Sequence, residues 1–544
     1  MQKLLFIFLG LWAFSVQAAT IQVTTTDDMV AKDNKCSLRE AVQAANENRT
    51  IDTCTAGSVN YTDVIQLHNQ SYLLNFNYLT VNSNVIIAGK GRDKTEINGQ
   101  NRTRLFFVTD KADLQLQDVS LVQGKTTQFG GAILNANGTT TLYHSLLKQN
   151  LATGTSSAGG AIFNFGGTVN LNYVLLENNV AQRGYGGGAV FNYQGQLNVE
   201  NSQFIGNQAT TGFGGAGIYN SEGTINILNS QFSANNASFG GGVFNWEGIA
   251  NLANVTLSNN QATFGAAINT YAGSTYVNYA TIMNNTATYA GAIDNDGQFY
   301  LTASIVLNNQ SKVGAADCHN GSNSQIHIGA YNAFSLNNGC GQQATDVIVN
   351  DADQQLDLAL QLNQALQPTP LTHAVLKDSA LINAIPAQDC RYRSYGTNPL
   401  FSHNDRVLVD QRNAARDYQQ SCDIGAYEFA AVPPTKIDSS PSLPSTHYLT
   451  VNVQGKGHVT SYPIGINCGT EQSCREAFYT GSQLMLTAEP AEGYQLQTWQ
   501  GDCATRDTRR LTRSIAPAVV EPPVNQTVRL ALDTHKQCTA VFGR

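Results

Sequence analysis

Charged residues are scarce in this chain of 544 residues. Only 13% of them are Asp, Glu, Lys or Arg, and the formal net charge is −8. No basic stripe runs along the sequence, which excludes nucleic acid and anionic membrane surfaces as partners on electrostatic grounds. Beyond residue 19, no apolar run reaches the roughly 18 residues that a membrane helix needs. We therefore expect no transmembrane segment once the N-terminal region is cleaved.

Residues 1–19 have the pattern of a secretory signal peptide. Lys3 supplies the positive charge, an eleven-residue apolar run follows at Leu4–Phe14, and Val16–Ala18 is a small-x-small cleavage site. The sequence therefore predicts an exported protein that is secreted or held at the cell surface or outer membrane.

Cysteine is missing between residues 55 and 317, and the ten cysteines fall into five neighbouring pairs. Disulfides persist in the oxidising compartments that an exported protein reaches. Zinc is the alternative, but the thiols lack a CxxC spacing and an accompanying histidine pair. We predict no metal or other cofactor. The predicted disulfides are Cys36–Cys54, Cys318–Cys340, Cys390–Cys422, Cys468–Cys474 and Cys503–Cys538.

What the sequence has in abundance is a repeat. GGAIFN (159–164) returns with small changes as GGGAVFN (186–192), GGAGIYN (214–220) and GGGVFN (240–245). We call the apolar residue of this motif the anchor, and its copies are spaced by 29, 28, 28, 25, 25 and 25 residues. The anchors are Ile133, Ile162, Val190, Ile218, Val243, Ile268 and Ile293.

A second motif, apolar-x-x-Asn-x-Ala, lies between the anchors. Its asparagine follows the anchor by 17 residues in six copies and by 16 in the last, so the length variation lies in one loop per repeat. Short alternating strands separated by Gly and Asn at this period predict an all-β fold, a right-handed parallel β-helix like that of pectate lyases. The asparagines are Asn150, Asn179, Asn207, Asn235, Asn260, Asn285 and Asn309.

Stacking of the coils explains the composition of both motifs. Equivalent residues of successive coils lie about 4.8 Å apart, so the anchors form an apolar column inside. Glycine allows the sharp turns that need positive φ. The asparagines of one corner are expected to bond the backbone and each other's amides in a ladder.

The front of a solenoid exposes unpaired strand edges and needs a cap. DNKCSLREAVQAANEN (33–48) predicts a short amphipathic helix, with a capping box formed by Ser37 and Glu40. Its apolar face consists of Leu38, Ala41, Val42 and Ala45.

The motif CSLREA at 36–41 resembles the opening of the CSLREA family of exported bacterial β-helix proteins. THAVLKDSALIN (372–383) and DQRNAARDYQQSCDIGAYEF (410–429) are similar to the choice-of-anchor module of that family, with Asn413 where Gly is usual. The repeats are similar to those of chlamydial polymorphic outer-membrane proteins. The resemblance implies the fold and export from a bacterial cell, and it implies no shared activity.

The chain divides by composition into six parts. They are the signal peptide 1–19, the N-terminal cap and first coils 20–126, the regular repeats 127–311, the end of the β-helix with the family module 312–429, a Pro/Ser linker 430–447 and a small β domain 448–544. LTVNVQGKGHVTSYPIGINC (449–468) and QLMLTAEPAEGYQLQTWQGDC (483–503) resemble the divergent internalin-type B repeat. We expect Trp499 to be a buried anchor of this small domain.

Two pairs of carboxylates are the candidates for acid/base catalysis on the β-helix. Glu222 and Glu247 occupy the same register on adjacent coils, and Asp294 and Asp296 alternate along one strand. No lysine or arginine lies in register with either pair, and catalysis of polysaccharide cleavage needs such partners or calcium. We favour solvated turn carboxylates and assign no catalytic residue.

Aromatic residues form two columns next to the anchors, at positions +1 and +3. These two positions share a face of the strand. If that face is outward, the columns are a platform that stacks on sugar rings or meets another protein; if it is inward, they belong to the core. The +1 residues are Phe163, Phe191, Tyr219 and Phe244, and the +3 residues are Phe165, Tyr193, Trp246 and Tyr271.

The variable loop is the third candidate for ligand binding. It is longest in the first three junctions, at 151–158, 180–186 and 208–213. Insertions confined to one corner map to one side of the stack, which is often the binding side. Arg183, Tyr185 and Phe213 lie in these loops.

The sequence thus favours an exported recognition protein, an adhesin that binds an extracellular glycan or a protein of a host or cell surface. A polysaccharide lyase or glycoside hydrolase on the same fold is the alternative. A purely structural envelope protein is the third reading.

Overall fold

The computed structural model describes residues 19–59, 61–209, 211–322, 324–336, 338–362, 369–394, 398–416, 421–434, 446–462, 466–479, 482–504, 527–532 and 534–544. The chain divides into two compact units, Met1–Thr435 and Lys436–Arg544. The predicted signal peptide, apart from its last residue, and most of the predicted linker lie outside the described residues, on 1–18 and 435–445.

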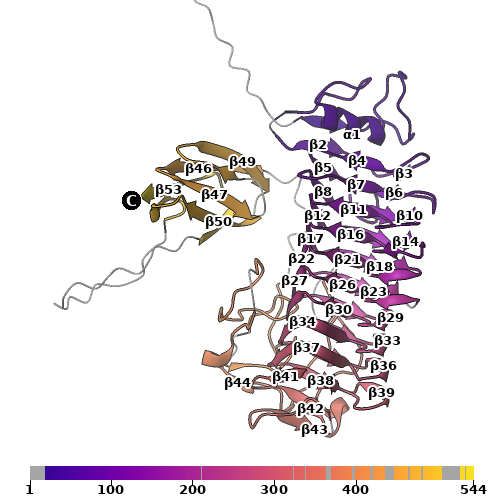
Figure 1. Ribbon diagram of the computed structural model, residues 1–544, viewed down its shortest axis with the longest axis vertical. Helices are drawn as coiled ribbons and strands as arrows, with labels where there is room; N and C mark the ends of the chain where they lie inside the picture. Colours follow the sequence, from indigo (N-terminus) through magenta and orange to yellow (C-terminus); the bar gives the residue numbers. More distant parts are fainter. Residues whose placement is uncertain are drawn as a thin grey trace, which may run out of the picture. The chain divides into compact units, whose positions relative to one another are not determined.

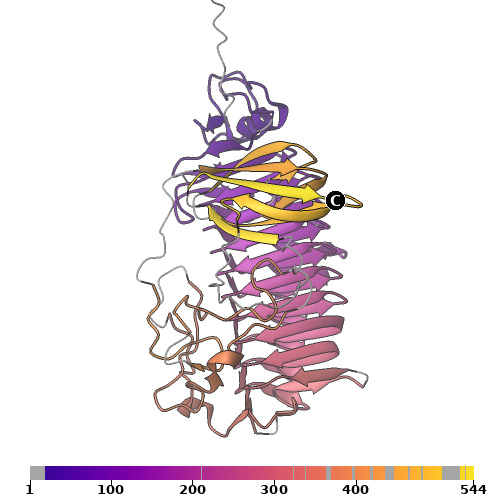
Figure 2. The same ribbon diagram turned by 90° about the vertical axis from the view of Figure 1, so that its left-hand side faces the viewer.

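The first unit is a right-handed parallel β-helix, as the repeat predicts (Figures 1 and 2). One coil consists of β16 (Ile162–Phe165), β17 (Thr168–Asn172) and β18 (Leu175–Glu177), and β19 (Val180–Ala181) follows at a corner. Each strand pairs in parallel with its equivalent in the next coil. Stacking of near-identical repeats therefore satisfies the backbone groups that a single coil leaves unpaired.

The strands of successive coils form four columns. The first column, which carries the anchors, contains β11 (Ile133–Ala136), β16, β21 (Val190–Tyr193), β26 (Ile218–Ser221), β30 (Val243–Trp246), β34 (Ile268–Asn278), β37 (Ile293–Thr302) and β40 (Cys318–Asn320). The second contains β12 (Thr139–Tyr143), β17, β22 (Gln196–Glu200), β27 (Thr224–Leu228), β31 (Ile249–Ala253), the later parts of β34 and β37, and β41 (Gln325–Ile328).

The third column contains β13 (Leu146–Lys148), β18, β23 (Gln203–Ile205), β28 (Gln231–Ser233), β32 (Thr256–Ser258), β35 (Thr281–Met283), β38 (Ile305–Leu307), β42 (Ala333–Ser335) and β43 (Val347–Val349). The fourth lies at a corner and contains β14 (Leu151–Ala152), β19, β24 (Gln208–Ala209), β29 (Asn236–Phe239), β33 (Gln261–Phe264), β36 (Thr286–Tyr289) and β39 (Gln310–Val313).

The anchors stack in register along the axis of the solenoid. Ile162 pairs with Val190, and each anchor pairs with the next one as far as Ile293. All seven anchors are fully buried, and burial of each such side chain contributes about 1.5–3 kcal/mol. Gly159 turns the chain before Ile162 at φ 67°, where a Cβ would collide with the carbonyl oxygen of Ile162. The glycines thus make the turns that the sequence analysis assigns to them.

The predicted asparagine ladder is present at the corner between the third and fourth columns. From Asn150 to Asn309, each side-chain amide nitrogen donates to the amide oxygen of the next asparagine at 2.9–3.0 Å. A second asparagine ladder runs two residues after the anchors, from Asn135 to Asn245, at 2.7–2.8 Å. Its asparagines belong to the glycine motif, for which the sequence analysis predicts no ladder. Both ladders are buried and satisfy turn groups that water does not reach.

Helix α1 (Leu38–Glu47) caps the first coils as predicted (Figure 1). The Ser37 hydroxyl accepts from the Glu40 amide, and the Glu40 carboxylate accepts from the Ser37 amide at 2.9 Å. The predicted apolar face is buried. The helix packs on the strands β2 (Asp63–Gln66), β4 (Leu79–Val81) and β5 (Asn84–Ala88) of the first coils.

The segment after β43 folds back along the outside of the coils, which the sequence does not predict (Figure 2). The His373 ring bonds the Ser258 hydroxyl at 2.9 Å, and the Thr256 hydroxyl donates to the Gln411 side chain at 2.6 Å. Both contacts are made to outward-facing residues of β32. We call residues 352–431 the return segment, and it contains the sequence that resembles the choice-of-anchor module.

The second unit contains, in its described residues, two four-stranded sheets. Its core includes Leu449, Leu486, Phe542 and Trp499, so the prediction that Trp499 is buried is confirmed. The strands are β46 (Thr446–Gln454), β47 (Gly457–Tyr462), β48 (Asn467–Cys468), β49 (Ser473–Tyr479), β50 (Ser482–Pro490), β51 (Gln495–Gly501), β52 (Thr527–Leu532) and β53 (Lys536–Gly543).

Disulfides join the five predicted pairs. Three lie in the first unit, at the cap, at the last coils and in the return segment, and two lie in the second unit. Each closes a loop where the ladder of the regular repeats does not hold the chain.

Candidate functional site

The residues at +1 and +3 point away from the core that the anchors form. The anchors belong to the main apolar cluster, whereas Phe163, Phe191, Tyr219 and Phe244 form a separate cluster. These side chains therefore face outward, which is one of the two alternatives that the sequence analysis leaves open. This outer side of the first-column strands is called the aromatic face below.

The four +1 rings are nonetheless almost fully buried, with only 2–6% of their surface exposed. Successive rings lie 4.5–5.3 Å apart between centroids, and Phe239 and Tyr185 pack against them from the corner. The expectation of a ligand-binding role for these four residues needs correction, because little of each ring is accessible. They support the neighbouring rings.

The +3 residues are the accessible part of the aromatic face. Phe165 and Tyr271 are more than two-fifths exposed, and Tyr193 and Trp246 are partly exposed. The Phe165 and Tyr193 rings stack at 5.6 Å, and Trp246 and Tyr271 lie 4.6 Å apart. Ser221 occupies the +3 position between these two pairs and separates them.

The longer early loops are ordered by a small sheet of their own. It consists of β15 (Ser157–Ala158), β20 (Gly184–Gly186) and β25 (Gly212–Gly214). Tyr185 and Phe213 project from it, are about half exposed and stack at 6.3 Å, so the structure brings the two predicted rings together. Arg183 lies two residues before Tyr185 and is exposed.

A further aromatic column on the later corner strands was missed by the sequence analysis. The rings of Phe239, Phe264 and Tyr289 stack at 5.2 and 5.4 Å, and Tyr289 is 44% exposed. Each of these residues follows the ladder asparagine of its repeat by four positions, and this constant spacing is enough to predict the column from the sequence.

The carboxylates Glu222 and Glu247 lie in the turn after the +3 position, on adjacent coils as predicted. Both are exposed, and Gln194 holds the same place one coil earlier and donates to Glu222 at 2.9 Å. All three residues have positive φ, between 52° and 56°.

Asp294 continues the +1 column and has a partner that the sequence analysis missed. Asn269 donates to one of its carboxylate oxygens at 2.7 Å, and Nδ1 of His319 lies 2.8 Å from the other. Burial raises the pKa of Asp294, and the bond to His319 opposes that shift. His319 follows Cys318, which pairs with Ile293 and extends the anchor series by another 25 residues. Asp296 lies on the same side of β37 and is exposed.

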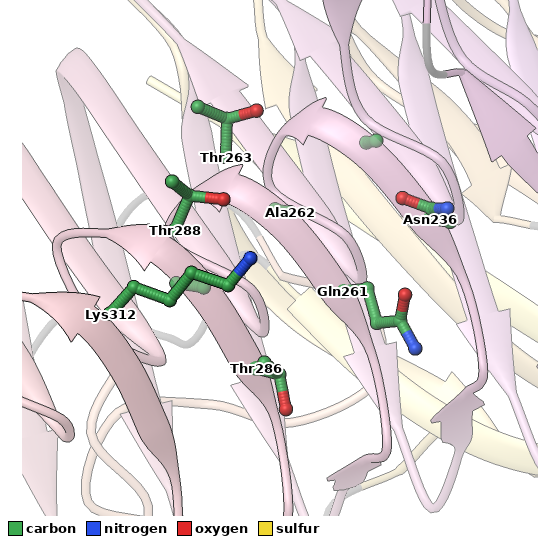
Figure 3. A pocket seen from close by; sticks show the side chains of 9 residues that line it. Asn236, Gln261, Ala262, Thr263, Thr286, Thr288 and Lys312 are labelled. Atoms are coloured by element: carbon green, nitrogen blue, oxygen red, sulfur yellow. The ribbon is translucent and has the colours of Figure 1, made fainter.

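A depression of about 360 Å³ lies along the corner strands β29, β33, β36 and β39 (Figure 3). Thr263 and Thr288 point the same way on adjacent coils, and Lys312 extends along the depression (Figure 3). Hydroxyls, amides and one ammonium make this a polar site that differs from the aromatic face. The lining residues are Asn236, Ala237, Gln261, Ala262, Thr263, Thr286, Ala287, Thr288 and Lys312.

Within the described residues, no three His, Cys, Asp or Glu side chains gather so that they could hold a metal ion. No helix in that part of the chain is long and apolar enough to cross a membrane.

Comparisons with known proteins found the following likenesses. Residues 448–521 match the family model of the divergent InlB B-repeat domain. No curated protein matches the chain. A crystal structure of the pectate lyase Pel9A is similar with 14% identity and a TM-score of 0.35, over 76% of this chain and 97% of that one. The family match thus covers the second unit of the chain, and the parallel β-helix of the first unit follows from its own strand pairings.

Proposed function

We propose that this protein is an exported glycan-recognition protein, an adhesin, that binds sugar rings on its aromatic face. The observation that supports the proposal most is the pair of accessible rings Trp246 and Tyr271, which lie 4.6 Å apart along the solenoid, with Trp246 packed against the buried rings. Rings held in this way lose little conformational freedom on binding, and their flat faces pack against the apolar faces of sugars.

The surroundings of the rings suit a sugar ligand. Gln194 follows Tyr193 in the turn, and Glu222 holds the equivalent place one coil later. Their exposed amide and carboxylate groups can form hydrogen bonds with sugar hydroxyls. Five disulfides fit a protein that works outside the cytoplasm. The B-repeat match adds a domain of the type found on surface proteins.

The first test is a glycan array screened with the mature protein and with the variant Trp246→Ala/Tyr271→Ala. We expect the double variant to bind the selected glycan at least about tenfold more weakly, because two stacking rings are lost. Tyr300→Ala is the control, since Tyr300 stacks on Tyr276 at 4.5 Å in the second strand column. Equal binding by the double variant and the wild type would reject the aromatic face as the site.

Polysaccharide cleavage is the second candidate function, and the bond between Asp294 and His319 favours it. A carboxylate that orients a half-exposed imidazole is an arrangement used for proton transfer. His319 exposes 48% of its side chain.

The second candidate is tested by incubating the wild type with acidic and with neutral polysaccharides and following their chain length by size-exclusion chromatography. Cleavage by the wild type that Asp294→Asn and His319→Gln both abolish would decide for the enzyme.

A further inference from the structure

The aromatic face carries negative charge beside its exposed rings. Glu247 directly follows Trp246 in the turn, and Glu222 lies one coil before it. Asp296 pairs in register with Tyr271 and continues the same column on the next coil. Three exposed carboxylates thus lie on the same coils as Trp246 and Tyr271 or on the adjacent ones.

Positive charge is absent from this stretch of the sequence. Between Arg183 and Lys312 the chain contains no lysine, arginine or histidine, while it contains Glu200, Glu222, Glu247, Asp294 and Asp296. Lys312 lines the corner depression, and Arg183 lies in the early loop. An anionic polymer laid along the later coils of the aromatic face would therefore be repelled.

The carboxylates act on the aromatic column itself. Burial raises the pKa of the Tyr219 hydroxyl, and the charge of Glu247 and the nearby Tyr185 raise it further. The negative potential of Glu247 thus reaches the supporting rings of the aromatic face.

We propose that the ligand of the aromatic face is a polysaccharide whose sugars carry free, protonated amino groups. This inference rests on the proposed glycan recognition and specifies the chemical class of the glycan. The sugar rings stack on Trp246 and Tyr271, while the ammonium groups pair with Glu222, Glu247 and Asp296 and lie against the ring faces. Successive amines along the polymer can pair with Glu222 and Glu247, which lie on adjacent coils.

The test compares chitosan oligosaccharides with their fully N-acetylated counterparts, which share the backbone and lack the charge. Binding is measured by calorimetry with the mature full-length protein, at a pH where the sugar amines are protonated. We expect the free amines to bind about tenfold more tightly, and added salt to reduce this preference.

Glu222→Gln/Glu247→Gln tests the carboxylates. Gln194 occupies the same column with φ 52°, so glutamine fits the backbone of this turn. Two exposed ion pairs contribute roughly 0.2–1 kcal/mol each, so the variant should bind chitosan about 2- to 30-fold more weakly. Glu177→Gln removes a carboxylate from the third column and is the control, expected to bind like the wild type.

Each outcome of these measurements decides something. Equal binding of the acetylated and free oligosaccharides, with no effect of the glutamine substitutions, would overturn the inference and leave the proposed glycan recognition standing. Preference for polylysine over chitosan would also overturn it, because the partner would then be a cationic protein. Failure of every glycan to bind would contradict the proposed function as well.

Discussion

Replacing Arg416 with methionine is expected to lower the free energy of unfolding of the β-helix unit by about 3–5 kcal/mol. Arg416 joins the return segment to the coils and is fully buried. Its guanidinium bonds the Glu428 carboxylate at 3.3 Å and the Asn254 side chain at 3.1 Å, and it lies 4.8 Å from the Tyr279 ring. The substitution would leave the Glu428 carboxylate buried without its cation, which costs more than the bond itself.

The effect of the substitution should depend on pH in a defined direction. Burial raises the pKa of Glu428 to about 7 in the folded protein, and Arg416 opposes this shift. A raised pKa means that the contribution of Glu428 to stability is full at low pH and is lost as pH rises through the folded-state value. Without Arg416 that value rises further, so the deficit should be larger at about pH 8 than at about pH 5.

Urea unfolding followed by circular dichroism measures both effects. The variant Arg416→Met/Glu428→Gln removes the charge together with its partner, and we expect it to regain part of the lost stability. A single substitution that costs nothing, or costs the same at both pH values, would show that the return segment is not held by this ion pair.

Replacing Asn207 with alanine is expected to lower the free energy of unfolding by about 2–4 kcal/mol. Its amide nitrogen donates to Asn235 and to the carbonyl of Leu176, and its oxygen accepts from the backbone and side chain of Asn179. Each buried polar group left unpaired costs about 1–3 kcal/mol, and relaxation of the neighbours recovers part of that sum.

Asn178→Ala is the control for the ladder, because Asn178 is exposed and adjacent in sequence. Its column contains Ala234 at φ 55°, so alanine fits the backbone there. We expect the control to unfold at nearly the urea concentration of the wild type. Equal destabilisation by both substitutions would mean that the cost arises from the turn and not from the ladder.

The sequence identified the rings of the candidate site but not their accessibility. Alternation with the anchors gives the direction of Phe191 and Tyr219 correctly, because a strand has a period of two. Tyr185 packs against Phe191, and Phe239 packs against Phe244 of the same column. The junctions that carry these two covering rings differ in length between coils, so the repeat alone does not show which rings are covered. His319 was missed because its repeat has a cysteine at the anchor position and no glycine motif before it.

The sequence by itself determined the solenoid, its register, the capping helix and the disulfide pairs. The capping helix and the disulfides depend on residues that are close in the chain. The solenoid and its register depend on a sequence spacing that recurs once per coil. Only the tertiary structure decided that the return segment lies along the outside of the coils and which rings remain exposed. Both depend on contacts over long sequence separations, such as that of Arg416 with Asn254, and no local pattern encodes such contacts.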